Sequence, residues 1–396
     1  MVPIPSIVCN YYEVRILIDA GDLEKIGYRN GLDAFGIAKA EQFTSTLKIL
    51  EKRKAQGLHA GMDFTYRNPL RSTTPTITMP DARSLIVGAR TYWKPKESLL
   101  KFSEPKGKVA LYAQENHYEK LKEGLSAIAQ ELTSHGYKAK VLVDDNALVD
   151  REAAFRAGVG WYGKNANILI PKRGSWFVLG SILTDAPLKP DTPVEEGCGS
   201  CTKCITACPT QAIISPGVID SNRCLAWLVQ SAQDFPPDFR EALGDKIYGC
   251  DDCQEICPIN KFEERIEGEK TREERSTVSI FEILEQGDQA LLLQYGQWYI
   301  PKRDPRYLRR NALLVLGNIG VAQDKRVRKI VMQYLSSPDS MLRSYAVWAA
   351  KRLGLNVFLE GMESDGSKEV QRELLLEVKQ NEKTKVWNLN QSQTKQ

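Results

Sequence analysis

Cysteine is the residue type whose spacing carries the strongest chemical signal in this chain. Eight of the nine cysteines fall between positions 198 and 257. A first run starts at Cys198 and reads C-G-S-C-T-K-C-I-T-A-C-P; a second starts at Cys250 and reads C-D-D-C-Q-E-I-C-P. The first run has the bacterial ferredoxin spacing, whose fourth cysteine ligates the other of two iron–sulfur clusters. Because each [4Fe–4S] cluster takes four thiolates, the eight cysteines predict two such clusters.

The crossover of the fourth cysteine decides which thiols share a cluster. Each Cys-Pro pair belongs to the opposite cluster, and Cys224 supplies the ligand that the second run lacks. The first set of ligands is therefore predicted to be Cys198, Cys201, Cys204 and Cys257. The second set is predicted to be Cys208, Cys224, Cys250 and Cys253.

Zinc and disulfides are the alternative uses of so many cysteines. Structural zinc usually takes two C-x-x-C pairs separated by a loop, and a third cysteine followed by Cys-Pro does not fit that pattern. Disulfides suit short secreted chains, whereas the N-terminus of this chain does not resemble a signal peptide. Cys9, which lies outside both runs, reads as an ordinary thiol near the terminus.

Composition limits the class of protein. The chain has 396 residues, of which 42% are hydrophobic, enough for two or three domains with their own cores. Its formal charge of +4 is nearly balanced, so a nucleic acid would have to be bound by a local patch. No apolar run is long enough to span a bilayer. Oxygen-sensitive clusters without an export signal predict a cytoplasmic protein. With only three histidines, a centre built from several histidines is disfavoured.

The elements that must position this chemistry largely precede it. Hydrophobic periodicity predicts a helix leading into a strand over 23–40, an amphipathic helix over 41–57, and another helix over 117–135. Residues 61–80, rich in Thr, Pro and Arg, are expected to form a long loop. Strands are predicted at Ser84–Trp93, Val109–Ala113 and Lys138–Val143.

The stretch 144–185 is unusually rich in glycine. A short helix is predicted near Asp150–Ala157, and strands Asn167–Ile170 and Trp176–Leu183 are predicted to form a hairpin around a Lys-Arg-Gly turn. The glycines fit turns and bulges as well as they fit close approach to a large flat cofactor. The stretch lacks the G-x-G-x-x-G pattern of a dinucleotide site.

After the cysteine-rich segment the composition and the pattern of the sequence change. The charges of Lys261–Arg275 predict a solvated linker or an exposed helix. Residues 304–320 then align with 338–354, with Leu308 opposite Leu342 and Ala312 opposite Ala346, as in HEAT-type repeats. The tail past Lys383 is polar and predicted to be disordered.

The combination of motifs resembles one enzyme family. L-V-D-R-E-A-A-F-R-A-G-V-G-W-Y-G-K-N at 148–165, G-S-W-F-V-L-G at 174–180 and the cysteine runs are similar to epoxyqueuosine reductases. The resemblance extends over roughly residues 60–360. It implies a cobalamin-dependent iron–sulfur enzyme that converts the epoxide of epoxyqueuosine in tRNA into the alkene of queuosine, the last step of queuosine biosynthesis.

The resemblance also implies an α+β architecture. The expected parts are a cobalamin-binding catalytic domain of α/β type (1–190), a ferredoxin-like domain with two [4Fe–4S] clusters (191–265), HEAT-like helical repeats (276–380) and a polar tail (381–396). Cobalamin would be reduced to cobalt(I) through the clusters. The expected partners are a tRNA anticodon stem-loop and an electron donor such as flavodoxin or ferredoxin, with no membrane and a monomeric chain.

The resemblance assigns roles to particular residues. Asp150 takes the place of the general acid, although sequence alone also fits an acid in the first turn of a helix. None of the three histidines stands in a D-x-H-x-x-G motif, so a bound cobalamin is expected to lack a protein imidazole on its lower face. The residues implied to contact cobalamin are Arg71, Ala113, Asp150, Gly174, Asp185, Cys257 and Pro258.

Other functions and a candidate RNA surface follow from the same residues. A corrinoid reductive dehalogenase acting on a small molecule, or a ferredoxin-type electron carrier, would also use such clusters. An RNA substrate would need basic residues near the site, although such residues also cap helices and pair with acids. The candidates are Lys172, Arg173, Lys302, Arg303, Arg306, Arg309, Arg310 and Arg343.

Overall fold

The structure is a computed structural model that describes residues 18–93, 104–195, 197–261 and 277–381. Cys9, nearly all of the charged stretch 261–275 and the polar tail lie outside these residues, so the predictions made for them are not addressed. No helix among the described residues is long and apolar enough to cross a membrane. The described elements form a mixed α+β fold, as the sequence predicts.

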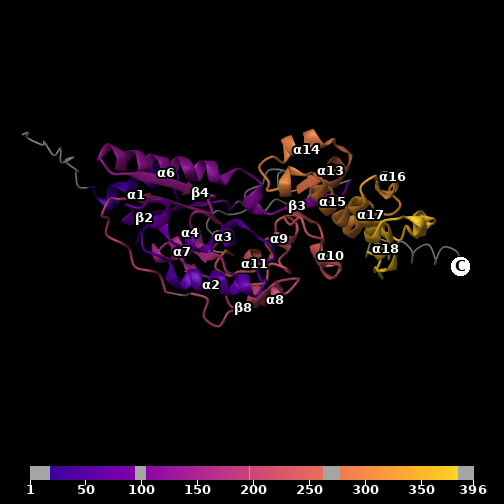
Figure 1. The fold of residues 1–396 in the computed structure, drawn as a ribbon, viewed down its shortest axis with the longest axis horizontal. Helices are drawn as coiled ribbons and strands as arrows, with labels where there is room; N and C mark the ends of the chain where they lie inside the picture. Colours follow the sequence, from indigo (N-terminus) through magenta and orange to yellow (C-terminus); the bar gives the residue numbers. More distant parts are fainter. Residues whose placement is uncertain (1–17, 94–103, 196, 262–276, 382–396) are drawn as a thin grey trace, which may run out of the picture.

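An antiparallel sheet in the order β1-β2-β7-β4 forms the N-terminal half (Figure 1). The strands are β1 (Ala34–Lys39), β2 (Ser84–Thr91), β7 (Phe177–Thr184) and β4 (Ala139–Val143). The apolar runs of β2 and β7 are buried because these strands are central and covered on both faces.

Helices on both faces of this sheet bury its apolar residues. Helices α1 (Ala20–Arg29) and α6 (His117–Ser134) pack on one face through Leu23, Leu121 and Leu125. Helix α7 (Asp150–Arg156) packs on the other face. Helix α2 (Thr44–Ala55) follows β1, as predicted.

Three local predictions need correction. Strand β7 pairs with β2 and β4, and β6 (Ile168–Leu169) pairs instead with β5 (Trp161–Tyr162). The predicted hairpin is therefore wrong, since a single bridge from Ile170 to Gly174 joins its two halves. The predicted loop 61–80 contains three one-turn helices, and two of them begin with proline, which suits a first helical position. They are α3 (Phe64–Arg67), α4 (Pro69–Ser72) and α5 (Pro75–Thr78).

The third correction concerns the predicted strand Val109–Ala113. Strand β3 (Lys106–Val109) stops at its start, and a 3-10 turn, η1 (Leu111–Ala113), follows. Strand β3 lies between β10 (Lys246–Tyr248) and β11 (Thr277–Ser279) in a second sheet. This sheet joins the N-terminal half to the cysteine-rich segment and to the C-terminal helices.

Short elements, with the loops between them, make up the cysteine-rich segment. They are α8 (Lys203–Ala207), β8 (Ile213–Ser215), β9 (Val218–Ile219), α9 (Leu225–Leu228), α10 (Pro237–Leu243) and α11 (Asp252–Glu255). In Figure 1 they lie between the large sheet and the C-terminal helices.

The C-terminal part is helical. Its elements are α13 (Ile280–Glu285), α14 (Asp288–Gln294), η3 (Pro301–Arg303), α15 (Arg306–Ile319), α16 (Lys325–Leu335), α17 (Ser340–Arg352), η4 (Asn356–Leu359), η5 (Met362–Ser364) and α18 (Lys368–Leu375). The two copies of the sequence repeat are α15 and α17, which pack together. Their aligned residues Leu308 and Leu342, and Ala312 and Ala346, are all buried.

A buried ion pair joins α10 to the last helix, α18. The Nη1 and Nη2 atoms of Arg240 donate to the two carboxylate oxygens of Glu373 at 2.7 and 2.9 Å. The exposed fractions of the two side chains are 0% and 1%. Removing one partner of such a pair costs about 3–5 kcal/mol because the other charge stays buried.

Candidate active site

A cavity lies where the large sheet meets the cysteine-rich segment. Its volume is about 330 Å³, which falls within the range of small-molecule and cofactor sites. One wall comes from the residues around β6 and the start of β7, and another from three cysteines of the second set. The lining residues used below are Tyr92, Tyr112, Tyr118, Arg151, Asn165, Asn167, Ile168, Ile170, Val178, Cys224, Cys250, Cys253 and Gln254.

The three tyrosines of the cavity are neutral hydrogen-bonding groups. Burial raises the pKa of Tyr92, Tyr112 and Tyr118 well above the ordinary tyrosine value. The Tyr92 hydroxyl accepts a hydrogen bond from Gln254 Nε2 at 3.0 Å, and the Tyr112 hydroxyl accepts one from Gln230 Nε2 at 2.8 Å. These bonds hold the two rings against the cysteine-rich segment.

Asp150 is the first residue of α7 and sits beside the cavity. Its neighbours Tyr118 and Arg151 line the cavity, while Asp150 itself is partly buried just behind them. Burial, and then the charge of Asp144, raise the pKa of the Asp150 carboxyl well above its ordinary value; Arg151 offsets part of this. Among the described residues this carboxyl accepts no hydrogen bond. A first-turn acid stabilised by the helix dipole would show the opposite shift.

Helix α4 holds the loop that leads into Asp150. The Ser72 hydroxyl donates to the Asn146 carbonyl at 2.6 Å, and the Val149 amide donates to the Ser72 carbonyl at 2.9 Å. Arg71 Nη1 donates to Asn146 Oδ1 at 2.7 Å. Arg71 therefore touches the loop that carries Asp150, although it does not line the cavity.

The electrostatic neighbours of the cysteines are compatible with the two predicted groups, which stay a prediction. After burial, Cys257 and Cys198 of the first set raise the pKa of Cys204. Again after burial, the pKa of Cys253 is raised by Cys224 and Cys208 of the second set and also by Cys204 of the first. No three His, Cys, Asp or Glu side chains of the described residues converge as ligands of a single ion. The grouping thus rests on which thiols are electrostatic neighbours.

Several residues expected at the cofactor are not among those that line this cavity, although Ala113 and Gly174 adjoin the lining residues Tyr112 and Ser175. Gly174 has a φ of +80° and packs on Asn260, whose Oδ1 would be 2.0 Å from an added Cβ. Asp185 is buried, follows the far end of β7 from the cavity, and accepts a hydrogen bond from the Lys138 amide. The carbonyl of Ala113 accepts from Trp298 Nε1 at 2.9 Å. Cys257 and Pro258 are likewise absent from the described lining.

The lining includes residues that the sequence reasoning missed. Tyr92 ends the predicted strand from 84, and Gln254 follows the second-set Cys253. Asn165 lies in the W-Y-G-K-N motif, and its amide donates to the Cys253 carbonyl at 3.3 Å. A polar residue ending a glycine-rich motif was the one available signal for Asn165.

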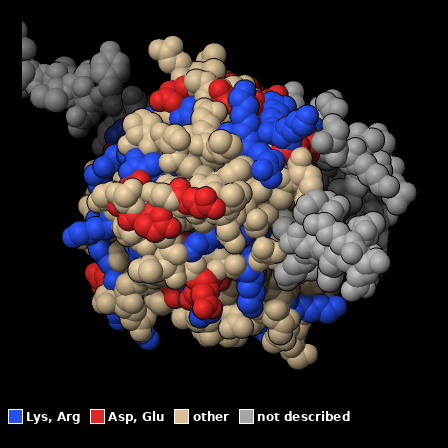
Figure 2. Space-filling model, turned by 90° about the vertical axis from the view of Figure 1, so that its right-hand side faces the viewer, with Lys and Arg blue, Asp and Glu red and all other residues tan. Residues whose placement is uncertain are grey.

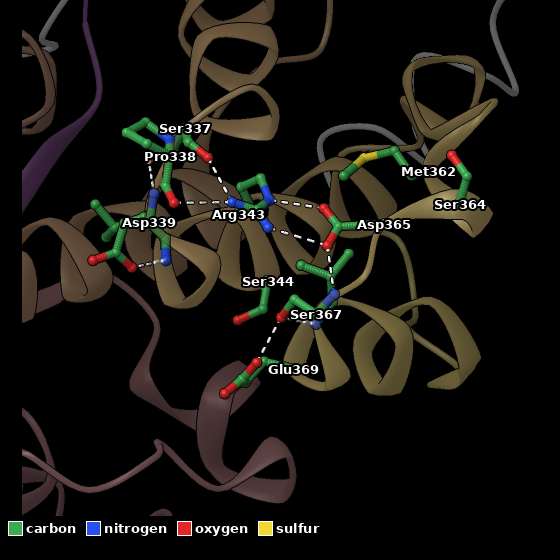
Figure 3. A network of polar contacts seen from close by, with 12 residues as sticks. Ser337, Pro338, Asp339, Arg343, Ser344, Met362, Ser364, Asp365, Ser367 and Glu369 are labelled. Atoms are coloured by element: carbon green, nitrogen blue, oxygen red, sulfur yellow. Dashed lines mark hydrogen bonds and ion pairs between the residues drawn. The ribbon is translucent and has the colours of Figure 1, made fainter.

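Most of the basic residues proposed for RNA are already engaged. Arg310 is completely buried, so a phosphate contact there is wrong; its guanidinium donates to carbonyls of Leu228, Ser231 and Gln233. Figure 3 shows Arg343 held by both carboxylate oxygens of Asp365 and by the carbonyls of Ser337 and Pro338.

Other basic residues proposed to bind RNA are also engaged by acids or by backbone carbonyls. Arg306 pairs with Asp304 and Asp339, and Arg309 pairs with Asp288. Arg173 pairs with Asp33, and Arg303 donates to three backbone carbonyls. Figure 2 shows basic and acidic side chains interspersed over this end of the molecule. Contact with phosphate stays a prediction for the exposed Lys172 and Lys302.

Two family models match the chain. The model described as "4Fe-4S double cluster binding domain" matches residues 197–260. The model described as "Epoxyqueuosine reductase QueG, DUF1730" matches residues 73–145.

Similar proteins cover most of the chain. The epoxyqueuosine reductase of Bacillus cereus is 32% identical over 358 residues, which cover 88% of this chain and 92% of the relative. That of Vibrio cholerae is 33% identical over 303 residues, covering 74% and 81%. The solved structure from Streptococcus thermophilus matches with a TM-score of 0.79 at 26% identity, covering 89% of this chain and 96% of that one. An epoxyqueuosine reductase crystallised with an epoxyqueuosine-modified tRNA-Tyr stem-loop matches with a TM-score of 0.77 at 27% identity, with the same coverage.

Fold and site together define an iron–sulfur oxidoreductase with a cavity beside its clusters. The identity of 32% over most of both chains is decisive. The chain belongs to the epoxyqueuosine reductase family.

Proposed function

We propose that this chain reduces the epoxide of epoxyqueuosine in tRNA to the alkene of queuosine. Its family supports this reaction, and a relative has been crystallised with an epoxyqueuosine-modified tRNA stem-loop. The observation that carries the proposal is the shared wall of the cavity, where three second-set cysteines, Cys224, Cys250 and Cys253, face the same space as three buried tyrosines. Electrons held at the second set reach this space without crossing another layer of protein.

The proposed cofactor of the cavity is cobalamin, which when bound supplies a strongly reducing cobalt centre. The apolar residues Ile168, Ile170 and Val178 offer a surface for a flat ring. The amides of Asn165, Asn167 and Gln254 offer donors and acceptors for the amide groups at its rim. The mixture of apolar walls and a few polar groups is typical of cofactor sites. That cobalt carries no protein imidazole stays a prediction.

Asp150 is the proposed proton donor. Conversion of an epoxide to an alkene consumes two electrons and two protons and releases water, so the leaving oxygen must be protonated. A raised pKa keeps the Asp150 carboxyl protonated at a pH where an ordinary aspartate is ionised. Arg151 beside it would attract the oxygen as negative charge develops there. A neutral tyrosine of the cavity can donate to the same oxygen only if its hydroxyl hydrogen is not already bonded to another protein atom.

The loop before Asp150 is the proposed positioning element. The Bacillus subtilis relative has been solved with its catalytic aspartate loop swung out of the active site. In this chain the bonds from Ser72 and Arg71 to Asn146 hold the corresponding stretch inward. Arg71 thus contributes through the loop, and its implied contact with cobalamin is not needed for this role.

The remaining assignments extend the same proposal. The tRNA anticodon stem-loop is the substrate, and flavodoxin or ferredoxin delivers electrons to a monomeric cytoplasmic chain. The domain limits proposed are 1–190 for cobalamin binding, 191–265 for the clusters and 276–380 for HEAT-like repeats. Burial of both Leu308 and Leu342 in the packed helices α15 and α17 supports the repeats.

The test is Asp150→Asn in cluster-loaded protein supplied with cobalamin and epoxyqueuosine-modified RNA. Turnover should fall by about 100-fold or more, because a positioned acid contributes that much. The cluster and cobalamin spectra should not change. Asp22→Asn on the exposed face of α1 is the control and should keep full activity. Near-normal turnover of Asp150→Asn would remove the acid role, and a wild-type protein inactive on this RNA would remove the proposed substrate.

A further inference from the structure

Trp161 carries a buried donor for which the described residues provide no acceptor. Its side chain in β5 is 6% exposed, and its Nε1 has no hydrogen-bond partner. Buried N–H groups without a partner are rare in folded proteins, and each one calls for an acceptor such as a ligand. Trp176 also has an unpartnered Nε1, but its ring lies edge-on to Tyr92 and not beside a cysteine.

The Trp161 ring packs against the backbone that leads into the first cysteine set. A Cβ added to Gly197 would lie 2.7 Å from Cζ2, 3.0 Å from Cη2 and 3.2 Å from Cε2 of Trp161. Cε2 is the ring carbon bonded to Nε1, and Gly197 directly precedes Cys198. The closeness requires glycine at 197 and places the indole ring next to the residue before the first thiol of the set.

The backbone around Trp161 is fastened along the same turn. Lys164 Nζ donates to the Gly199 carbonyl at 2.6 Å, between Cys198 and Cys201. The Gly217 amide donates to the Lys164 carbonyl at 3.0 Å. Strand pairing of Trp161 with Leu169 fixes the other side. These contacts fix the backbone that carries the indole beside the first set.

We propose that Trp161 donates its indole N–H to a sulfur atom of the cluster held by the first set, and thereby raises the reduction potential of that cluster. Thiolate and sulfide sulfurs are hydrogen-bond acceptors, and hydrogen bonds to them are among the factors that set cluster potentials. The bond strengthens when the cluster gains an electron and negative charge, so it favours the reduced state. Trp161 is a tuning residue for electron entry.

This inference rests on the double-cluster domain and not on the identity of the substrate. Under this inference, only the first-set cluster accepts a hydrogen bond from an indole N–H. Beside the second set, Trp227 has its Nε1 satisfied by the Ala60 carbonyl at 3.0 Å. The indole N–H of Trp227 is therefore not available to a cluster, and Trp227 serves as the matched control.

The experiment is a redox titration of both clusters, followed by EPR, in the cluster-loaded protein without substrate. Trp161→Phe should lower the potential of one cluster and leave the other unchanged. A tenfold loss in its reduction equilibrium is about 59 mV for a one-electron couple. Trp227→Phe should leave the first-set cluster unchanged. Two unaltered potentials in Trp161→Phe with full iron content would overturn the proposal.

A second measurement tests the proposal even if the Trp161→Phe protein loses iron. Wild-type protein grown with ¹⁵N-indole tryptophan is reduced and studied by pulsed EPR. A nitrogen coupling at a reduced cluster supports the hydrogen bond, and its absence at both clusters overturns it. Neither readout uses turnover, so a failed substrate assignment would leave both results interpretable.

Discussion

The two cysteine sets lie in opposite surroundings within one short segment. Around the first set, Ser200, Lys203 and Pro258 are exposed to solvent. Around the second set, Leu225 and Tyr248 are buried, and three of its cysteines line the cavity. The first set thus lies nearer to solvent, and the second lies beside the cavity.

Their supports differ as well. The first set is fastened by the adjacent W-Y-G-K-N segment through Lys164. The second depends on α15, almost 80 residues further along, where Arg310 binds the carbonyls of Leu228, Ser231 and Gln233 just after Cys224. Similar ligand spacing can therefore hold one cluster by local contacts and the other by the whole fold.

The largest expected effect separates the two sets by their roles. Cys253→Ala should abolish turnover with any reductant, by more than about 1000-fold, because the cavity loses its adjacent cluster. Cys201→Ala should lose turnover driven by flavodoxin but keep turnover driven by a small chemical reductant, which can reach the second set directly. Iron content should fall by about half in both. Equal inactivity of both variants with the chemical reductant would break the distinction between entry and delivery.

A smaller effect tests the remote support of the second set. Arg310→Met should lower the free energy of unfolding by about 3 kcal/mol or more, because three buried carbonyls lose a charged donor. Denaturant unfolding measures this change, and EPR should show the second-set cluster as the more labile one. Arg306 on the same helix is 45% exposed and pairs with Asp304 and Asp339 at the surface, so Arg306→Met should cost less than about 1 kcal/mol. Similar losses of unfolding free energy in both variants would contradict the supporting role of Arg310.

The smallest expected effect is the pH dependence that Asp150 gives to stability and turnover. Because the pKa of Asp150 is raised in the folded protein, the folded state binds its proton more tightly than the unfolded chain does. Stability should therefore fall as pH rises between the two pKa values, and turnover should fall as pH rises through the folded one. Asp150→Asn removes the cost of the buried charge and should be at least as stable as wild type at pH 8. Thermal unfolding at pH 5 and pH 8 measures this difference, and a wild-type protein that gains stability over that range relative to Asp150→Asn would contradict it.

Local patterns in the sequence were sufficient for some parts of the fold. The helix at 117–135 and the strand at 84–93 were predicted because their periodicity reflects their own burial. The double-cluster domain was predicted from the spacing of the cysteines. The hairpin was wrong because β7 is the central strand between β2 and β4, and partners that distant leave no local pattern.

The cavity could not be predicted for a related reason. Its walls come from residues as far apart as Tyr92 and Gln254, which meet only after both sheets form. The arginines at the repeat entry show the same limit, since Arg309 and Arg310 are adjacent in sequence, yet one reaches an exposed acid and the other is buried. The alignment of the two repeats indicates where each helix begins. It does not indicate which groups of the neighbouring domain the arginines of that helix contact.

The ion pair between Arg240 and Glu373 has a consequence for modularity. Ferredoxin-type segments are often thought of as portable, to be cut out and joined to other proteins. Here the cysteine-rich segment keeps a guanidinium in its interior whose countercharge arrives from α18, more than 100 residues later. A shortened chain that ends before α18 would leave the buried guanidinium with only the distant, half-exposed Asp234 at 3.7 Å. The cluster segment is therefore expected to need the final helix for its full stability.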